Sequence, residues 1–557
     1  MIHGRWENTD NPGDYPSFPS LFGRLAIWFL FAVIISSFIY KTKSKLLKVI
    51  IFFVVFSLYG IQHFLITNFH QPISSAYLVL IIETNSKESK DFIDTFILSD
   101  KVFPTLKNIL FYTIAFLVSN YVWRKFFIPK INNHLPDKIR ILFSLPFIIF
   151  VLWGLYNCKI YASIVRADSA DNIHSLEKPQ DPFSCLFSSI IMLKNMNSNL
   201  ATAVEATQKG VESAYLNESG QKEPLNIILI IGESYIKWHS SLYGYPHETT
   251  PLLEAERDKG SLFVFNDVVT MSNKTSIVMK NILSCNNYCK SEEWFNYPYF
   301  PAIFKHVGYD VFFWDNQKET DSKANFSFTL NSFIYHPDIC SLSYTHNNDH
   351  SFNYDDELVE SFIEKIGKPK NLRNLIIFHL QGQHVHPASR FPQTPNNIRF
   401  TKDSINRHDS YMTPDKRQYI ADYDNATLYN DKVISHIFTH FSNSSSVAIY
   451  LSDHGEEAYD YQDQFMRDHG PLTKNKIKYQ YEIPFMIWCS DKYKNNHPEM
   501  IARIRNAENK PYTSNYLCHL ILGLANIKTP FYINHLDLLH PDYKCGKRKI
   551  EQMYYSL

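Results

Sequence analysis

The segment Asn226–Glu233, with the sequence NIILIIGE, decides the fold because it joins an apolar run to an acidic residue. A short apolar run of this kind is typical of a strand that is covered on both faces of a sheet. Asn374–His384 (NLIIFHLQGQH) and Ser446–His454, which ends in VAIYLSDH, repeat the pattern. The three segments end on residues that can bind a metal or a substrate, namely Glu233, His384, Asp453 and His454.

The chain around these segments alternates short apolar runs with longer mixed stretches. Strands are predicted at 226–231, 261–265, 310–314, 374–380, 446–452 and 483–489. Helices are predicted between them, at 275–284, 298–307, 355–366 and 423–440. This order indicates an α/β domain with a central, mostly parallel sheet between helices, in which ligands bind at the carboxyl ends of the strands.

A polar patch, Ser272–Ser276 (SNKTS), contributes a candidate nucleophile, Thr275. A threonine at the start of a helix is most often an N-cap, which is the simpler interpretation. The same position offers helix N–H groups to a phosphate, and a bound cation would lower the pKa of the hydroxyl so that it can attack. Ser272 and Ser276 are alternative nucleophiles.

Adjacent carboxylate and imidazole groups in Asp453-His454-Gly455 suit zinc. The alternative is that Asp453 caps a following helix and His454 is a surface residue. His384 and His386 follow another predicted strand, and His469 lies in RDHGP. Histidines at such positions suit substrate binding, a second metal or a general acid, although isolated histidines are more often surface residues.

The composition limits the class of protein. The 557 residues carry 55 basic and 55 acidic side chains, so overall charge gives no argument for nucleic-acid binding. Eight cysteines occur without a CxxC pair, which argues against a cysteine zinc site or a thioredoxin-like motif. In an oxidising compartment some of them are expected to form disulfides, but the sequence does not give the connectivity.

The first part of the chain is apolar and predicts a membrane region. After a polar leader at 1–21, a transmembrane helical domain at 22–158 is expected, with spans at about 22–40, 46–66, 108–125 and 140–157. The loop after the first span carries Lys41, Lys43 and Lys45, and the loop between the last two spans is also rich in lysine and arginine. Both loops are therefore predicted to be cytoplasmic, which places the rest of the chain outside.

Three further regions complete the predicted organisation. Residues 159–222 are expected to form a linker with a bridging helix at Ala201–Tyr215. Residues 223–545 are expected to form the catalytic domain, and 546–557 a C-terminal tail.

Several motifs occur together in an order that resembles the lipid A phosphoethanolamine transferases. They are the apolar spans, GES…LYGYPHETTP (232–251), the threonine segment (272–285), GYDVFFWDNQ (308–317), His384, YDNATLYND (423–431) and SDHGEE (452–457). That family consists of membrane-anchored members of the alkaline phosphatase superfamily with a sulfatase-like catalytic domain. The resemblance covers nearly the whole chain, and one departure from it is His247, where many members have a basic residue.

The resemblance implies an activity and a set of site residues. Glu233, Thr275, Asp453 and His454 would bind Zn²⁺, with Thr275 also the nucleophile, and the substrate-binding residues would be His384, His469, Asn316 and Lys274. Thr275 would take phosphoethanolamine from phosphatidylethanolamine and pass it to a lipid A or lipopolysaccharide-core acceptor. It also implies a bacterial inner-membrane location with a periplasmic catalytic domain, and it is compatible with a role in polymyxin resistance.

Three other functions stay open at this point. A related glycerol-phosphate transferase would share the threonine and the metal site, and a phosphodiesterase would pass the group to water. A non-catalytic membrane scaffold would keep only the fold. A sulfatase is disfavoured because no cysteine or serine has the required C/S-x-P-x-R context.

Overall fold

The computed structural model describes residues 41–69, 92–122, 182–216, 223–318, 333–467, 472–551 and 553–555, with isolated residues and short runs between 26 and 165. These residues belong to two compact units. One comprises Met1–Met196 with Asp468–Gly470, and the other comprises Asn197–Arg467 with Pro471–Leu557.

Two helices of the N-terminal unit are long and apolar enough to cross a membrane. They are α2 (Lys45–Phe69) and α5 (Phe103–Val122), and their most apolar windows have mean hydropathies of 2.2 and 1.5. Helix α2 contains the predicted span 46–66, whereas α5 begins before the predicted span 108–125 and ends at Val122. The leader 1–21 lies outside the described residues, as do most of the predicted spans 22–40 and 140–157.

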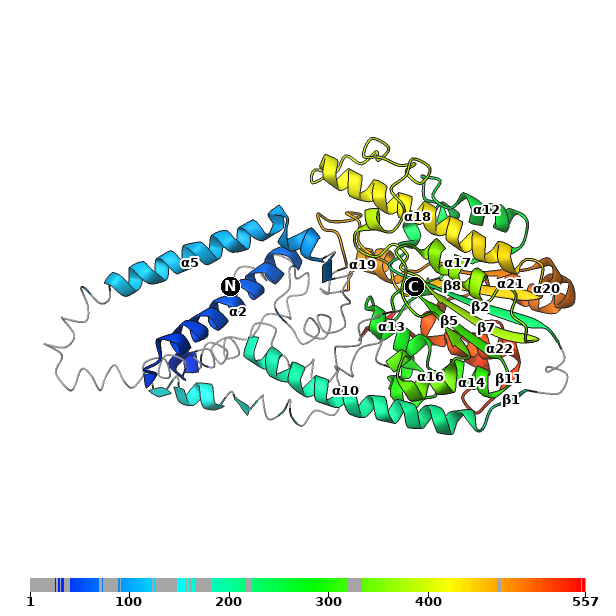
Figure 1. Ribbon diagram of the computed structural model, residues 1–557, viewed down its shortest axis with the longest axis horizontal. Helices are drawn as coiled ribbons and strands as arrows, with labels where there is room; N and C mark the ends of the chain where they lie inside the picture. Colours follow the sequence, from blue (N-terminus) through cyan, green and yellow to red (C-terminus); the bar gives the residue numbers. More distant parts are fainter. Residues whose placement is uncertain are drawn as a thin grey trace. The chain divides into compact units, whose positions relative to one another are not determined.

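The second unit is built on a seven-stranded sheet with the order β3-β9-β8-β2-β7-β5-β6 (Figure 1). Its strands are β2 (Leu225–Gly232), β3 (Leu262–Phe265), β5 (Asp310–Asp315), β6 (His346–Asn347), β7 (Arg373–His379), β8 (Ser446–Ser452) and β9 (Phe485–Cys489). Strand β2 pairs in parallel with both β7 and β8, and β5 pairs in parallel with β7 and β6. The expected α/β sheet is therefore present.

The sheet is mixed but mostly parallel, as the sequence indicates, because only the two pairs made by β9 are antiparallel. Strand β9 runs antiparallel to both of its neighbours, β8 and β3. An apolar run carries no information about strand direction, so this reversal was not accessible to the pattern. The carboxyl ends of β2, β7 and β8 still meet at one edge, because these three strands are adjacent and parallel.

Helices cover both faces of the sheet, because alternate residues of each buried strand point to opposite faces. Ile227, Leu229 and Ile231 pack into one hydrophobic cluster, and Ile228 and Ile230 pack into the other. The first face is covered by the C-terminal part of α10 (Pro182–Val211), with α13 (Thr275–Ile282), α14 (Phe300–His306), α16 (Pro337–Ser343), α20 (Asp491–Asn496), α21 (Pro498–Ala507) and α22 (Leu517–Ala525). The opposite face is covered by α12 (Pro251–Asp258), α17 (Asp355–Lys365) and α18 (Pro414–Phe441) (Figure 1).

Two helices are longer than the sequence pattern indicated. Helix α10 begins at Pro182 rather than near residue 201, because a proline is tolerated at the first position of a helix and does not have to mark a linker. Helix α18 begins at Pro414 rather than near residue 423. The Thr413 side chain caps this start, because it accepts a hydrogen bond from the Lys416 N–H.

Small strand pairs complete the second unit. They are β1 (Tyr215–Leu216) with β11 (Ile527–Lys528), β4 (Val268–Val269) with β10 (Tyr512–Thr513), and β12 (Arg548–Ile550) with β13 (Met553–Tyr555). The last pair is a hairpin within the segment expected to be a tail. A disulfide joins Cys285, just after α13, to Cys518 in α22, with a Cα–Cα distance of 5.5 Å.

Candidate metal and nucleophile site

Three buried side chains meet at the carboxyl ends of β2 and β8. Glu233 directly follows β2, and Asp453 and His454 directly follow β8. Gly232 pairs with Ser452 in the sheet, so the residues that come next along the two strands leave it side by side. All three side chains are at most 1% exposed. Adjacent parallel strands thus bring together residues that are more than 200 positions apart in the sequence.

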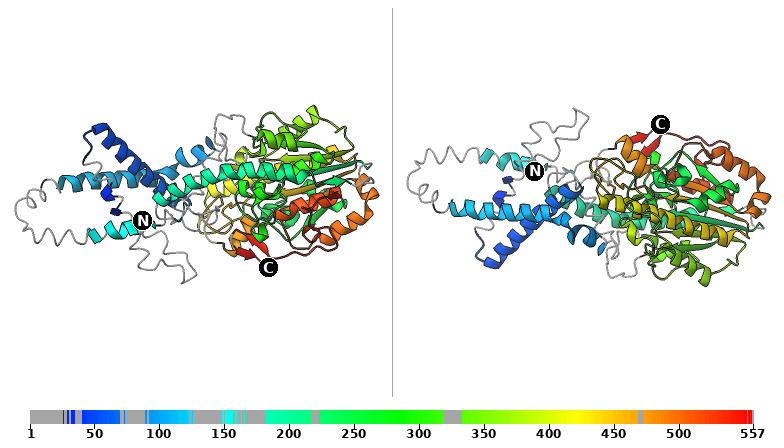
Figure 2. Two further views of the ribbon diagram at one scale, coloured as in Figure 1. Left: turned by 90° about the horizontal axis from the view of Figure 1, so that it is seen from below. Right: turned by 90° about the horizontal axis from the view of Figure 1, so that it is seen from above.

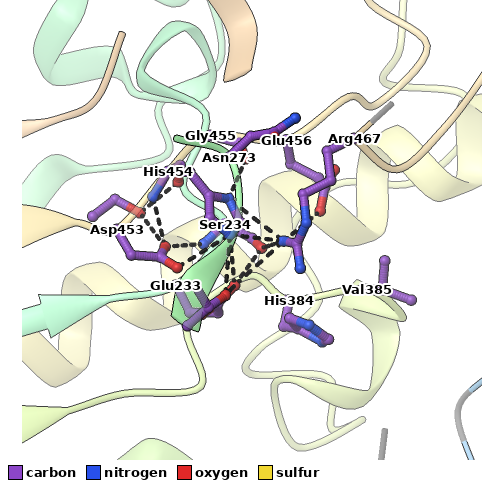
Figure 3. A network of polar contacts seen from close by, with 12 residues as sticks. Glu233, Ser234, Asn273, His384, Val385, Asp453, His454, Gly455, Glu456 and Arg467 are labelled. Atoms are coloured by element: carbon purple, nitrogen blue, oxygen red, sulfur yellow. Dashed lines mark hydrogen bonds and ion pairs between the residues drawn. The ribbon is translucent and has the colours of Figure 1, made fainter. Parts of the chain in front are cut away.

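The distances within this cluster suit a single metal ion. His454 Nε2 lies 3.3 Å from Glu233 Oε1 and 3.1 Å from Asp453 Oδ2 (Figure 3). One ligand atom from each residue can be chosen so that all three lie within 4.8 Å of one another. Two carboxylates and one imidazole form a donor set typical of zinc.

Thr275 is the first residue of α13 and turns its hydroxyl toward this cluster. Thr275 Oγ1 lies 3.1 Å from Glu233 Oε2 and 3.2 Å from His454 Nε2. The N-cap position belongs to Lys274, which has no capping hydrogen bond from its side chain. Thr275 is therefore not the simple helix cap that its sequence position also allowed.

The backbone fixes how Asp453 and His454 face the cluster. Asp453 Oδ1 accepts the N–H groups of Ser234, at 3.1 Å, and His454, at 2.7 Å. Asp453 Oδ2 is buried and has no hydrogen-bond partner among the described residues. His454 Nδ1 lies 2.6 Å from the Gly455 carbonyl, which can only accept a hydrogen bond, so the lone pair of the neutral ring is on Nε2. Asp453 Oδ2 and His454 Nε2 are thus oriented toward each other within the cluster.

The turn after Glu233 adopts an unusual backbone conformation that other residues hold in place. Ser234 has φ +58°, in the left-handed region that non-glycine residues rarely adopt. The Tyr423 hydroxyl donates to the Ser234 carbonyl at 2.5 Å and accepts the Ile236 N–H at 2.7 Å. Gly382 approaches from β7, and a Cβ there would lie 2.5 Å from the Glu233 carbonyl oxygen. Only glycine fits at this point of contact.

Arg467 is a cation of the cluster that sequence reasoning did not identify. Its Nη1 lies 2.8 Å from His454 Nε2, 3.5 Å from Glu233 Oε1 and 3.6 Å from Glu456 Oε2 (Figure 3). Although burial opposes ionisation, the contact with His454 and the charge of Arg467 hold the pKa of Glu233 well below its usual range. Burial and the Glu233 charge raise the pKa of Asp453 to about 7. The cluster is therefore organised for a cation.

His384 follows β7 and lies next to the cluster (Figure 3). Burial, together with the charges of Arg390 and Arg467, lowers its pKa to about 3. The ring is thus neutral at physiological pH and can accept a proton or a hydrogen bond. The other predicted histidine, His469, lies outside the described residues.

Asn316, a predicted substrate-binding residue, and its neighbour Gln317 make different contacts beside the cluster. Asn316 is buried and donates to Asp355 Oδ1 at 2.8 Å, and Asp355 in turn accepts the Gly382 N–H at 2.9 Å. Asn316 therefore supports the loop that touches Glu233. Gln317 is the residue that reaches the cluster, because its Nε2 lies 3.3 Å from Glu233 Oε2. Nothing in the apolar pattern distinguishes these two neighbours.

The remaining polar residues of the nucleophile segment point in different directions. Lys274 is half-buried, and its side chain forms no ion pair within the described part of the chain. Ser272 is fully buried and donates to Glu551 Oε1 at 2.8 Å, so it is not presented to the cluster. Of the three hydroxyls considered as nucleophiles, that of Thr275 contacts the Glu233 carboxylate and the His454 imidazole.

Known proteins of similar sequence are phosphoethanolamine transferases. Phosphoethanolamine transferase EptC of Escherichia coli K12 is 26% identical over 534 residues, which cover 94% of this chain and 87% of the relative. The Kdo(2)-lipid A phosphoethanolamine 7''-transferase of the same organism is 26% identical over 278 residues, which cover 48% of this chain and 45% of the relative. The resemblance stated from the motifs is thereby confirmed.

Solved structures show the same architecture. The periplasmic domain of Escherichia coli EptC is 29% identical with a TM-score of 0.52, and its complex with Zn is 28% identical with a TM-score of 0.51; each covers 60% of this chain and 91% of the known chain. The integral membrane protein EptA of Neisseria meningitidis, at 16% identity, shares the fold over 93% of this chain and 96% of its own, with a TM-score of 0.57.

The family profile named Sulfatase matches residues 225–527. This range begins with the first residue of β2 and contains Glu233, Thr275, Asp453, His454 and Arg467. The matched region is thus the sheet together with the whole of the cluster at its edge, and on this basis the chain belongs to the sulfatase family.

Proposed function

We propose that this chain is a membrane-bound phosphoethanolamine transferase that uses Thr275 as its nucleophile. The observation that carries the proposal is the position of the Thr275 hydroxyl, within 3.3 Å of both a buried carboxylate and a buried imidazole. The relatives that cover most of the chain are phosphoethanolamine transferases, which supports the choice of the transferred group.

Glu233, Asp453, His454 and Thr275 would hold Zn²⁺. The buried Asp453 Oδ2, which lacks a hydrogen-bond partner among the described residues, and His454 Nε2, whose fellow ring nitrogen faces the Gly455 carbonyl, fit such an ion. The zinc complex of the EptC domain supports the same metal here. When bound, Zn²⁺ would lower the pKa of the threonine hydroxyl and offset negative charge on the phosphoryl group.

The protein residues then have distinct tasks in two transfer steps. In the first, Thr275 Oγ1 loses its proton and bonds to the phosphorus of phosphatidylethanolamine, while the bond from phosphorus to the diacylglycerol oxygen breaks and that oxygen takes up a proton. In the second, an oxygen of the acceptor attacks the same phosphorus and Thr275 is released. Neutral His384 is suited to move a proton in either step, and the N–H groups of the first turn of α13 favour the phosphate charge.

The acceptor is proposed to be lipid A or the lipopolysaccharide core. The Kdo(2)-lipid A transferase among the relatives supports this substrate class. The apolar helices α2 and α5, together with the similarity to an integral membrane protein, support attachment to the bacterial inner membrane, with the catalytic unit in the periplasm. Placing an ammonium group on a lipid phosphate would weaken its attraction for cationic peptides, which is the physical basis for a link to polymyxin resistance.

The full-length protein incubated with phosphatidylethanolamine tests this function directly. Intact-mass measurement should detect one phosphoethanolamine adduct on the wild type, and peptide mapping should place it on Thr275. The Thr275→Ala variant should remain folded and bind zinc but carry no adduct, whereas Thr275→Ser keeps a hydroxyl and should be modified. An adduct that persists in the alanine variant would identify a different nucleophile.

The acceptor requires a separate measurement in cells. Mass spectra of lipid A and of the core oligosaccharide from cells with and without the gene should differ by phosphoethanolamine. Identical spectra in both fractions, with the Thr275 adduct still formed in vitro, would exclude a lipopolysaccharide acceptor and favour transfer to water or to another envelope glycan.

A further inference from the structure

The C-terminal hairpin, β12 with β13, lies beyond the region that matches the sulfatase profile, which ends at residue 527. It nevertheless packs into the catalytic unit. Ile550 forms a hydrophobic cluster with Val269 and Tyr481, and the hairpin lies beside the segment that precedes β9 (Figure 2).

Glu551, in the turn of the hairpin, binds the segment that leads to the nucleophile. Its N–H donates to the Met271 carbonyl at 2.8 Å, and its Oε1 accepts the Ser272 hydroxyl at 2.8 Å. The same Oε1 accepts the Tyr481 hydroxyl at 3.2 Å. Met271 and Ser272 are both fully buried. One residue therefore holds the backbone and a side chain only a few positions before Thr275.

The backbone conformation at position 551 indicates that glutamate is present there because of its carboxylate. Ile550 pairs with Met553, so the two strands are joined by two residues, and Glu551 has φ +50°. Two-residue turns with positive φ strongly favour asparagine, aspartate or glycine, and glutamate gains nothing from this conformation. Backbone strain of this kind persists where the surrounding structure or the function over-determines it.

The nucleophile segment is also held from a second side. The Asn273 side-chain amide donates to Gln480 Oε1 at 2.9 Å, and both residues are buried. Residues 271–273 are thus fixed by hydrogen bonds to two different parts of the chain. Thr275 follows after a single residue, Lys274, at the start of α13.

We infer that Glu551, in the turn of the C-terminal hairpin, is a positioning residue for Thr275 and acts through its hydrogen bonds to Met271 and Ser272. The inference rests on the proposed function of Thr275. By fixing Met271 and Ser272, Glu551 sets the start of α13 and hence the direction from which Thr275 Oγ1 reaches phosphorus. A displacement of about 1 Å at a reacting atom can slow a reaction by roughly 100-fold.

The decisive variant is Glu551→Asn in the full-length, zinc-loaded protein. Asparagine suits the left-handed backbone, so the melting temperature should stay the same or rise, whereas the bond to Ser272 is lost. The rate of adduct formation on Thr275 should fall by about 10- to 100-fold with unchanged zinc content. Ser272→Ala should slow the reaction similarly, and the double variant should be little slower than either single one, because both remove the same contact.

Two further variants separate positioning from general stability. Glu551→Asp keeps a carboxylate and should recover part of the rate. Tyr554→Phe removes another hydrogen bond of the hairpin, from its hydroxyl to the Cys289 carbonyl at 3.3 Å, and should react at the wild-type rate. An equal loss in Tyr554→Phe, or a wild-type rate in Glu551→Asn, would overturn the inference. Absence of an adduct on the wild type would instead refute the proposed function.

Discussion

Two buried clusters of histidine and carboxylate side chains are built from neighbouring stretches of the sequence but differ in what they can bind. The first is the site cluster, Glu233, Asp453 and His454. The second, here called the closed cluster, is His239 with Asp424 and Asp460. His239 Nδ1 lies 2.7 Å from Asp424 Oδ1, and Nε2 lies 3.0 Å from Asp460 Oδ1. By composition alone, both could be metal sites.

Their hydrogen bonds separate them. In the closed cluster both ring nitrogens of His239 face carboxylates, and Asp424 Oδ2 is paired with Tyr245 and His247. The site cluster keeps a buried oxygen, Asp453 Oδ2, without a hydrogen-bond partner among the described residues. A buried polar atom that the protein leaves unsatisfied, rather than the residue types, is what indicates a ligand.

The largest contrast is expected from matched substitutions in the two clusters. Asp453→Asn should lower zinc affinity by at least roughly 100-fold, which is the loss that a change in a residue supporting a metal ligand can cause. The stability of the metal-free protein should change little. Asp424→Asn should leave zinc affinity unchanged but destabilise the fold by about 3–5 kcal/mol, because it breaks a buried ion pair. Chelator competition and thermal unfolding of the full-length protein would measure both effects. Loss of zinc in Asp424→Asn would contradict the comparison.

The closed cluster should also produce a pH dependence of stability. Burial opposes protonation of His239, but the charges of Asp460 and Asp424 dominate and raise its pKa to about 10. A raised pKa stabilises the fold fully below the unfolded value of about 6.5, and this contribution is lost as pH rises toward 10. Stability should therefore fall by up to about 1.4 kcal/mol per pH unit in this window.

Thermal unfolding between pH 6 and pH 10 would test this expectation. His239→Gln removes the titrating group, so its melting temperature should be lower at pH 6 and decline less with rising pH. Parallel curves for the wild type and the variant would show that His239 does not carry the effect.

The smallest effect is expected at the arginines beside the two clusters. Arg467 lies among the proposed zinc ligands, so Arg467→Gln should raise zinc affinity by about tenfold through the loss of like-charge repulsion. The metal-free variant should melt at a lower temperature, because the carboxylates lose their counter-ion. Arg407 donates to the Asp460 carbonyl of the closed cluster, and Arg407→Gln should not alter zinc affinity. Equal changes in both variants would indicate a general charge effect.

Residues at the ends of regular strands could be predicted from the sequence, and residues in loops could not. Glu233, Asp453 and His454 each follow an apolar run. The pattern therefore predicted both the strand and the side chains that lie at the sheet edge where the strand ends. Arg467 and Glu551 come from irregular segments, where no periodicity relates position to direction. The reversal of β9 had no signal either.

One family motif became interpretable only with the structure. In YDNATLYND, Tyr423 holds the turn at Ser234 beside the site, while the next residue, Asp424, belongs to the closed cluster. Neighbouring residues on one helix thus serve the two clusters separately. His247, the departure from the family pattern, pairs with Asp424 at 2.7 Å and so lies outside the site cluster.

The bond between Cys285 and Cys518 has a consequence for the biogenesis of the enzyme. It ties the end of α13, the helix that begins with Thr275, to α22 and closes a loop of 233 residues that contains Asp453 and His454. Disulfides form and persist in oxidising compartments and are rare in the cytosol. In the proposed periplasmic location, this cross-link would form only after export, and assembly of the candidate site would be tied to that step.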